Sequence, residues 1–551
     1  MNVLLGGIFI NSIEISSVRV YRPTVDNEII VRQELINLLK SKNYPQTTSD
    51  PTVINEISQT IYKFCFTSFK EAIGKIYSRH LTEFLLDVYS RWSQIFNMLK
   101  SGKLSEIEST RYQNIGPPAR IAIQYCLEKI VELEPAEAPS VSEVEQLFWM
   151  DRMVIAAEFM VLTSGQSSTS FTIFPNKCTL KLCLDATLHE DYMIFTLDDS
   201  IKQKLDQYNH IRAFHFPEKY ASFYAPAPAS DILSRLNNVF EEIKGITLSQ
   251  IVNCILMTSN SSKTIDGLDC CFVLEDDLYK AVAHNAELDV DTVKWVFSGV
   301  VLNKEMFENE NREIWRPRQS NRSLRRPFLR LPHRLGPHLC WNDSMVKESF
   351  LYVIQELCFR KVPNEWDEVA LSKLIDQVSF KFDLEWESVV FEELKKRGLV
   401  GEKSIKKINK IDGTHINIGN TPGEIDCLMW DPVNNSIFLI EIKRTQPSFN
   451  PTQYRDEISK YFLDEKSYIT KLNQKVTWLQ ENVQLILEHL LVKGYISSVP
   501  ANSPDLNVLL VTKYECFAKV LDVLPVEIIS LTELLYHYDN NNEWRGTVIQ
   551  I

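Results

Sequence analysis

The spacing of apolar residues changes along the first part of the chain. Residues 1–35 alternate loosely between apolar and polar positions, which predicts strands. From 54 to 99 the apolar residues return every three or four positions, and this period predicts two or three helices. A further helix is expected after Pro118, ending near Leu133, and the Pro- and Glu-rich residues 134–140 are typical of a linker.

The next part of the chain mixes the two periods. We expect a helix over 143–163, a polar loop over 164–170, and strands over 171–184 and 192–197. Further helical patterns follow up to residue 345. The pattern therefore predicts a mixed α/β region in the middle of the chain.

Two β-rich apolar runs near the C-terminal end are separated by turn residues. Ile425–Trp430 and Ile437–Lys443 flank the sequence Asp-Pro-Val-Asn-Asn, so we expect a hairpin whose loop is Pro432–Asn435. The simplest register of this hairpin places Asp426 directly opposite Glu441.

The charged residues of the hairpin form a pattern that stability alone does not explain. Cross-strand neighbours have Cβ atoms roughly 4.5–5.5 Å apart. Two carboxylates at so short a distance repel each other unless a cation lies between them. Converging carboxylate oxygens suit Mg²⁺. Lys443 is two residues past Glu441 and therefore shares its face. Because buried strands rarely end in three charged residues on one face, Asp426, Glu441 and Lys443 are candidate site residues.

A helix upstream of the hairpin supplies a third acidic candidate. The apolar pattern predicts a helix over 384–397, and Gly398 is a good residue to end it. Val390 and Leu394 lie three and seven positions after Glu387, so Glu387 shares the buried face of this helix. An inward-facing glutamate there can complete a metal site.

The elements after the hairpin are also readable. Gln453 opens a predicted helix of about 453–463, and a longer helix runs through Leu491. Residues 507–512 and 526–531 are expected to be buried strands.

This order of elements resembles the PD-(D/E)xK, or restriction-endonuclease-like, nuclease core. The first element is a helix with Glu387, which is followed by a strand over 404–411 and then by the strand with Asp426. The strand with the Glu-x-Lys motif comes next, and a helix and a further strand follow it. The residues Gly-Glu-Ile-Asp that lead into the hairpin are similar to the NERD-like and Holliday-resolvase-like branches of that superfamily. The resemblance covers about 380–535, roughly a third of the chain. It departs from the family pattern at Ile425, where the motif has proline.

The resemblance implies a role for each candidate residue. Asp426 and Glu441 would bind Mg²⁺, for which Mn²⁺ can substitute, and Lys443 would position or activate water. Glu387 would add to the metal site, and Gln453 would support it from the next helix. The alignment of Gln453 is the weaker one, because it follows Glu441 closely and comes just after a proline.

The implied function is Mg²⁺-dependent hydrolysis of phosphodiester bonds, with DNA as the expected substrate and an endonuclease of defence or restriction type as the setting. The N-terminal regions would target or regulate cutting. The alternative is a catalytically inactive nuclease-fold protein that serves as a nucleic-acid-binding or assembly subunit. An RNA nuclease and an ordinary α/β domain with an ion pair at its strand ends also stay open. Side chains of Asp426, Glu441 and Lys443 that converge within about 5–6 Å around a metal-sized gap would favour catalysis. A Lys443 that points away from the carboxylates, or a remote Glu387, would favour binding.

An arginine-rich stretch near residues 312–334 holds eight arginines and a single acid, with aromatic residues between them. A guanidinium group can donate two parallel hydrogen bonds to a phosphate and can stack on a base. This stretch therefore predicts contact with nucleic acid. A structural or interdomain role is the alternative. The predicted nucleic-acid-binding residues are Arg316, Arg318, Arg322, Arg325, Arg326, Arg330, Arg334 and, beside the hairpin, Arg444.

Length suggests three or four domains at about 150 residues each. We expect a mixed α+β multidomain protein with mostly helical N-terminal regions that include some strands. Its domains would be 1–135, with strands and helices; 141–345, mixed α/β; and 346–551, with the nuclease core. Many nucleases of this fold cut both strands as dimers, so the resemblance also favours a homodimer, or a protein partner bound through the N-terminal regions.

Composition narrows the class of protein further. The chain has 551 residues, of which 44% are hydrophobic, and a net charge of −13, which argues against histone-like coating of nucleic acid. No apolar run reaches the ~18 residues of a membrane span, so no membrane is expected. The eleven cysteines are scattered, and no CxxC pair is followed by a second one, which favours reduced thiols in the cytoplasm.

Overall fold

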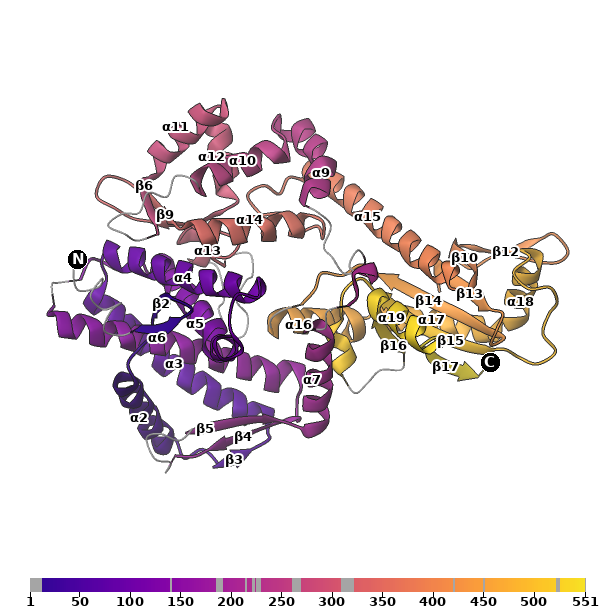
Figure 1. Cartoon of the computed structure of the whole chain (residues 1–551), viewed down its shortest axis with the longest axis horizontal. Coiled ribbons are helices and arrows are strands. Elements are labelled where there is room, and N and C mark those ends of the chain that lie inside the picture. Colours follow the sequence, from indigo (N-terminus) through magenta and orange to yellow (C-terminus); the bar gives the residue numbers. More distant parts are fainter. Residues whose placement is uncertain are drawn as a thin grey trace. The chain divides into compact units, whose positions relative to one another are not determined.

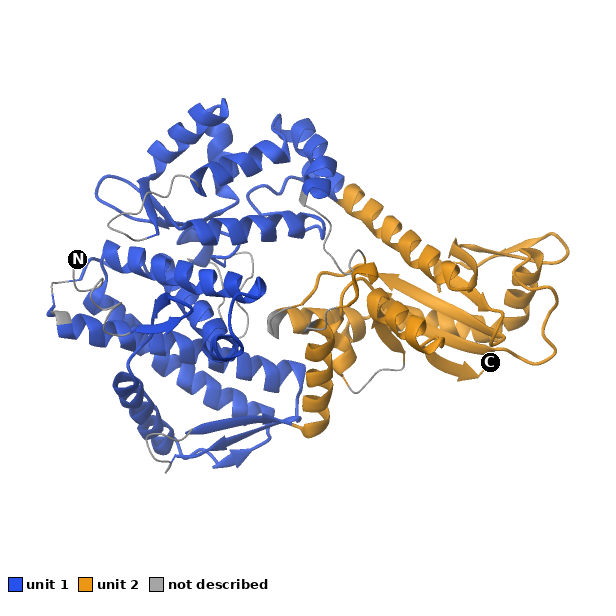
Figure 2. Cartoon of the chain, viewed as in Figure 1, with its two compact units in different colours: residues 1–197, 228–375 blue, residues 198–227, 376–551 orange. Residues whose placement is uncertain are grey.

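The chain forms two compact units in the computed structural model (Figures 1 and 2). Unit 1 comprises residues 1–197 and 228–375, and unit 2 comprises residues 198–227 and 376–551. The structure describes residues 12–138, 141–184, 192–213, 216–220, 223, 229–259, 269–308, 322–419, 422–448, 451–521 and 526–550. Both units contain helices and strands, so the expected mixed α+β class is confirmed.

Unit 1 opens with a short hairpin, β1 (Ser12–Ile15) and β2 (Val18–Tyr21). The strands predicted to continue to residue 35 are wrong, because α2 (Val25–Ser41) begins here. The Thr24 side chain accepts the hydrogen bond from the Asn27 N–H and caps this helix. Buried residues four positions apart on α2 then hold one face of the helix against the unit.

The helices predicted over 54–99 are confirmed as α3 (Pro51–Ile76) and α4 (Arg79–Lys100). The helix predicted after Pro118 begins earlier, since α5 spans Glu106–Leu133 and starts at a capping box of Ser105 and Glu108. Pro117 and Pro118 lie inside α5, where packing against neighbouring helices offsets the main-chain bonds they cannot make.

The helix α6 (Glu143–Ser168) continues through the predicted polar loop and ends in a π-helix, η1 (Thr169–Ile173). The hydroxyls of Thr169 and Ser170 donate to the carbonyls of Gly165 and Gln166, one turn back, so these polar residues are accommodated within a helix. Because α6 packs against α3 and α5 across the predicted linker, residues 1–135 do not form a unit of their own.

Two further sheets and a group of helices complete unit 1. One sheet has the order β3 (Thr47–Thr48), β4 (Cys178–Leu182), β5 (Met193–Leu197). The other has the order β6 (Cys271–Leu274), β9 (His338–Trp341), β8 (Phe328–Leu331), β7 (Val301–Leu302). The helices are α9 (Ala229–Lys244), α10 (Leu248–Ser259), α11 (Glu275–Ala286), α12 (Val290–Ser298), α13 (Glu305–Glu308) and α14 (Asp343–Leu357).

Unit 2 is built on one mixed sheet with the order β10 (Val400–Ile405), β13 (Ile425–Asp431), β14 (Ser436–Lys443), β15 (Asp505–Thr512), β16 (Glu527–Ser530). The strand β13 is antiparallel to both of its neighbours, whereas β14, β15 and β16 run parallel. A last strand, β17 (Thr547–Gln550), pairs with the first half of β15. A small hairpin of β11 (Lys407–Asn409) and β12 (His415–Asn417) lies between β10 and β13 in the chain.

The helices of unit 2 cover both faces of this sheet (Figure 1). The end of the long helix α15 (Val369–Lys396) and α19 (Leu531–Asn541) contribute Val390, Leu394 and Leu534 to the core on one face. The helices α17 (Tyr468–Glu481) and α18 (Val483–Val492) contribute Leu472 and Leu487 to the core on the other. The central strands are therefore buried on both sides, as their apolar sequences predict.

The predicted hairpin register is confirmed. Asp431 pairs with Ser436, and the ladder continues to Cys427 opposite Ile440. The preceding strand begins at Val400 and not at the predicted residue 404, because Gly398, with a φ of +97°, ends α15 and lets the chain turn at once into the sheet.

The segment 198–227 belongs to unit 2 although it precedes unit 1's second half in the chain. It holds α7 (Asp199–Ala213) and a short 3₁₀ turn, η2 (Glu218–Tyr220). Tyr220 donates to Asp539 of α19 at 2.6 Å, and the Lys219 ammonium lies 2.8 Å from the same carboxylate. This segment therefore packs on α19 within unit 2.

Candidate active site at the end of the central strands

The structure brings Asp426, Glu441 and Lys443 together where β13 begins and the antiparallel β14 ends. The Lys443 Nζ lies 2.7 Å from Glu441 Oε1 and 3.2 Å from Asp426 Oδ2. The main-chain N–H of Ile442 donates to Asp426 Oδ2 at 3.0 Å. Lys443 thus points toward both carboxylates, as the shared face of the two strands predicts.

A second lysine, Lys475 of α17, completes this cluster. Its Nζ lies 2.5 Å from Glu441 Oε2 and 3.2 Å from Asp426 Oδ1. Sequence reasoning missed this residue. A signal was present, since Lys475 falls between the buried Leu472 and Leu479 on the apolar face of its helix.

The cluster is balanced in charge, with Glu441 and Lys475 buried and Asp426 and Lys443 half-buried. Burial by itself would raise the pKa of Asp426, but Lys443, Lys475 and the Ile442 N–H hold this pKa below its ordinary value. Burial by itself would lower the pKa of Lys443, but Glu441 and Asp426 raise it above its ordinary value. Asp426 is therefore a carboxylate and Lys443 an ammonium at neutral pH.

Glu387 lies on α15 near Asp426, where the helix was predicted to present it. Burial and the negative charge of Asp426 raise the pKa of Glu387 to about 7. Within the part of the chain that the structure describes, no group of three or more His, Cys, Asp or Glu side chains is placed to hold a metal ion. The part of Glu387 in the metal site that the resemblance implies stays a prediction.

Gln453 lies in the first turn of α16 (Pro451–Ile458), which continues as a π-helix, η4 (Ser459–Leu463). Together these elements match the helix predicted over 453–463. The Gln453 side chain is buried, and its main-chain carbonyl accepts a hydrogen bond from the Ser448 hydroxyl at 3.3 Å.

Arg444, the residue after Lys443, is held within the fold. Its Nε donates to Asp383 at 2.7 Å, and its Nη2 donates to the Ser379 hydroxyl at 3.2 Å. This guanidinium ties the end of β14 to α15. These contacts are structural, and the predicted binding of nucleic acid by Arg444 stays a prediction.

The described arginines of the arginine-rich stretch are mostly paired with acids of unit 1. Arg325 and Arg326 are buried, and they pair with Glu356 and Glu365 respectively. Because their guanidinium groups are enclosed and already bonded, these two residues are unsuited to hold a phosphate, which favours the structural alternative for them.

The other arginines of the stretch are placed differently. Arg322 pairs with Glu128 at 3.1 Å and Arg330 with Glu275 at 2.9 Å, while Arg334 is exposed. Arg316 and Arg318 lie outside the described residues. For these five, contact with nucleic acid stays a prediction.

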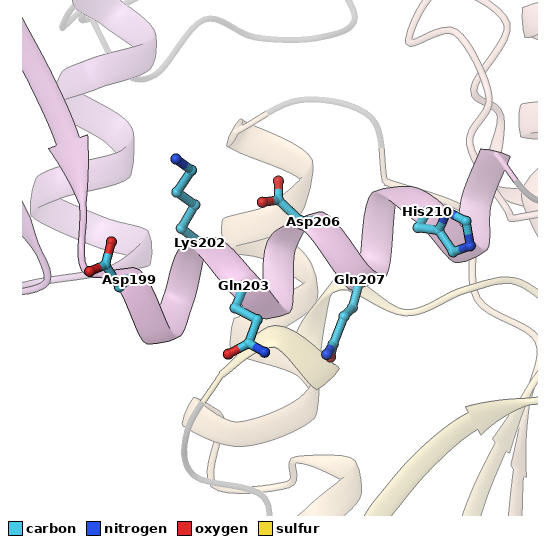
Figure 3. Close-up of a pocket in the computed structure, with 6 residues that line it drawn as sticks. All are labelled: Asp199, Lys202, Gln203, Asp206, Gln207 and His210. Atoms are coloured by element: carbon cyan, nitrogen blue, oxygen red, sulfur yellow. The ribbon is translucent and has the colours of Figure 1, made fainter.

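A shallow hollow of about 510 Å³ follows one face of α7 (Figure 3). Its lining comprises Asp199, Lys202, Gln203, Asp206, Gln207 and His210. Figure 3 shows these side chains spread along the helix, and they do not converge on one point. The cluster around Asp426 is therefore the stronger candidate site.

No protein family, curated protein or solved structure matches this chain. Among the described residues, no helix is both long enough and apolar enough to cross a membrane.

Proposed function

We propose that unit 2 is a Mg²⁺-dependent nuclease that hydrolyses phosphodiester bonds. DNA is the expected substrate, and an endonuclease of defence or restriction type, targeted or regulated by unit 1, is the expected setting. The observation that carries this proposal is the contact of Lys443 with both Asp426 and Glu441 at the end of two adjacent strands. A helix with Glu387 before the hairpin, and a helix and parallel strand after it, support the resemblance to the PD-(D/E)xK core.

The donor set suits a hard divalent cation. Asp426 and Glu441 offer carboxylate oxygens from neighbouring strands, and these are the ligands that Mg²⁺ prefers. These two residues would hold the ion, with Glu387 close enough for its pKa to respond to Asp426. A bound Mg²⁺ would polarise the scissile phosphate and favour ionisation of a bound water.

Lys443 contributes a fixed positive charge beside the reacting phosphate. The two carboxylates raise the pKa of Lys443 above its ordinary value, which favours its ammonium form. An ammonium there donates hydrogen bonds, so it would orient water or the developing charge on the phosphate. The Ile442 N–H keeps the Asp426 carboxylate turned toward β14 while this happens.

The second candidate function is the catalytically inactive nucleic-acid-binding or assembly subunit. One observation favours it: Lys475 already compensates the charge of both carboxylates, as in an ion-pair cluster that only stabilises a fold. The two functions differ in metal-dependent chemistry, which is directly measurable.

The test is digestion of plasmid DNA, single-stranded DNA and RNA with Mg²⁺, Mn²⁺ or EDTA. We expect metal-dependent cutting that is at least about 100-fold slower in Asp426→Asn, Glu441→Gln and Lys443→Met. Glu392→Gln, which removes an exposed carboxylate from α15, is the matched control and should cut as the wild type does. Cutting that survives in Glu441→Gln would contradict this site, and no cutting of any substrate would favour the inactive subunit.

A further inference from the structure

Two ammonium groups divide the four carboxylate oxygens of the cluster between them. Lys443 bonds Asp426 Oδ2 and Glu441 Oε1, whereas Lys475 bonds Asp426 Oδ1 and Glu441 Oε2. Each lysine therefore bridges the two carboxylates through a different pair of oxygens. A cation that binds both Asp426 and Glu441 therefore competes with these lysines for the carboxylate oxygens.

We propose that Lys475 is a displaceable counter-ion of the site, which holds the two carboxylates together and must withdraw when a divalent cation binds. Lys475 thereby sets the metal affinity of the site. This inference rests on the proposed function, because it takes Asp426 and Glu441 as the metal ligands.

The contacts of the two lysines indicate which ammonium group leaves the carboxylates when a cation binds. Lys443 stands two residues from Glu441 on the same strand, and its ammonium also donates to the Ile442 carbonyl at 3.0 Å. Among the described residues, the Lys475 ammonium contacts the Asp426 and Glu441 carboxylates alone. Lys475 also reaches the site from a separate helix on a long flexible stem, so its withdrawal leaves the strand pairing intact.

Charge balance gives the physical reason for the exchange. Two carboxylates and two ammonium groups sum to zero, so adding a divalent ion would leave an excess of two positive charges. The surroundings are buried, since Glu441 is 3% exposed and Lys475 is 5% exposed, and such a site tolerates uncompensated charge poorly. Withdrawal of the Lys475 ammonium removes one of these positive charges and frees one oxygen on each carboxylate.

The test is calorimetric titration of the full chain with Mn²⁺, together with thermal unfolding with and without Mn²⁺. We expect Lys475→Met to bind Mn²⁺ at least about tenfold more tightly than the wild type, or about 1.4 kcal/mol. Its unfolding temperature should also rise more on addition of Mn²⁺. Lys475→Arg, which keeps the charge, should bind as weakly as the wild type. Lys471→Met, one turn earlier on α17 and exposed, is the matched control and should also behave as the wild type.

The variants separate this inference from the proposed function. Equal Mn²⁺ affinity in Lys475→Met and the wild type, with metal-dependent cutting in both, would overturn the inference and leave the nuclease standing. Tighter Mn²⁺ binding in Lys475→Met that disappears on adding Asp426→Asn, without cutting by any protein, would support the counter-ion and overturn the nuclease. No Mn²⁺ binding by any variant would overturn both. Should Lys475→Met not fold, Lys475→Gln keeps an N–H donor without the charge and carries the same expectations.

Discussion

The carboxylate of Asp426 accepts a hydrogen bond at 3.0 Å from the main-chain N–H of Ile442, the residue between Glu441 and Lys443. The ladder between the two strands ends one residue earlier, with Cys427 opposite Ile440. The Asp426 side chain therefore takes the place of a main-chain partner beyond the ladder. This bond fixes the direction of the carboxylate, so that Oδ2 faces Lys443 and Oδ1 faces Lys475.

The bond to Ile442 predicts different effects for two substitutions of Asp426. Asp426→Ala leaves the Ile442 N–H without its acceptor and leaves Glu441 as the one carboxylate that faces the two ammonium groups, so we expect a loss of about 3 kcal/mol in the free energy of unfolding. Asp426→Asn keeps an oxygen for Ile442 and should lose less. Urea unfolding of both variants measures the difference. Equal losses would show that the hydrogen bond contributes nothing to stability.

Buried Arg326 predicts a structural effect in unit 1. Its Nη1 donates to the carbonyls of Ser298 at 2.9 Å and Val301 at 3.1 Å, and its Nη2 pairs with the Glu365 carboxylate. Arg326→Met leaves these acceptors without a donor and should lower the free energy of unfolding by about 3 kcal/mol.

The control for Arg326 is Arg334→Met, because Arg334 belongs to the same stretch and is exposed. Denaturant unfolding of this variant should match the wild type to within about 0.5 kcal/mol. A stable Arg326→Met protein would contradict the structural role of Arg326.

His489 of α18 uses both ring nitrogens to bond residues of two strands, Asn409 of β11 and Glu402 of β10. The Asn409 N–H donates to His489 Nδ1 at 2.9 Å, so the proton is on Nε2, which donates to Glu402 at 2.6 Å. His489→Leu leaves the Asn409 N–H without its acceptor and leaves Glu402 paired with Lys493 alone, so the free energy of unfolding should fall by about 2 kcal/mol. Amide exchange at Asn409, followed by mass spectrometry, should become faster than in the wild type. Unchanged exchange there would count against this bond.

Asp539 predicts an acid-dependent loss of stability. Hydrogen bonds from Arg397, Lys219 and Tyr220 hold the pKa of Asp539 well below its ordinary value, although partial burial acts in the opposite direction. A carboxyl group whose pKa is lowered by folding stabilises the folded protein at pH values above the pKa that the group has in the unfolded chain, about 4. This contribution is lost as the pH falls below that value.

The measurement is unfolding of Asp539→Asn across pH. We expect the variant to be about 1 kcal/mol less stable than the wild type at pH 7, after allowance for solvent screening. The gap should narrow below about pH 4. Asp505→Asn, an exposed carboxylate at the start of β15, should show no such change. A constant gap at all pH values would contradict the ion pairs that bind the segment 198–227 to unit 2.

Local patterns were sufficient for the hairpin that carries the site. Pro432–Asn435 and the apolar runs on either side determine a register that involves only neighbouring residues, and the structure confirms it. The helix with Glu387 was predictable for the same reason, because its buried positions recur with the helical period and Gly398 ends it.

Local patterns were misleading where tertiary packing outweighs residue preference. Pro117 and Pro118 suggest the start of a helix, yet they lie in the middle of α5, which is packed between α4 and α6. The polar residues 164–170 suggest a loop, yet α6 and η1 include them because their hydroxyls bond to carbonyls of the preceding turn.

The sequence by itself determined the central hairpin of unit 2, its register and the shared face of Asp426, Glu441 and Lys443. Only the tertiary structure decided that Lys475 joins them, because 49 residues separate Lys475 from Asp426 and α17 must pack on the sheet to bring the two together. The same holds for Arg325 and Arg326, whose acidic partners follow on α14 and beyond it. A sequence displays the charge of each residue, but only the packing of distant elements decides which opposite charge is near enough to neutralise it.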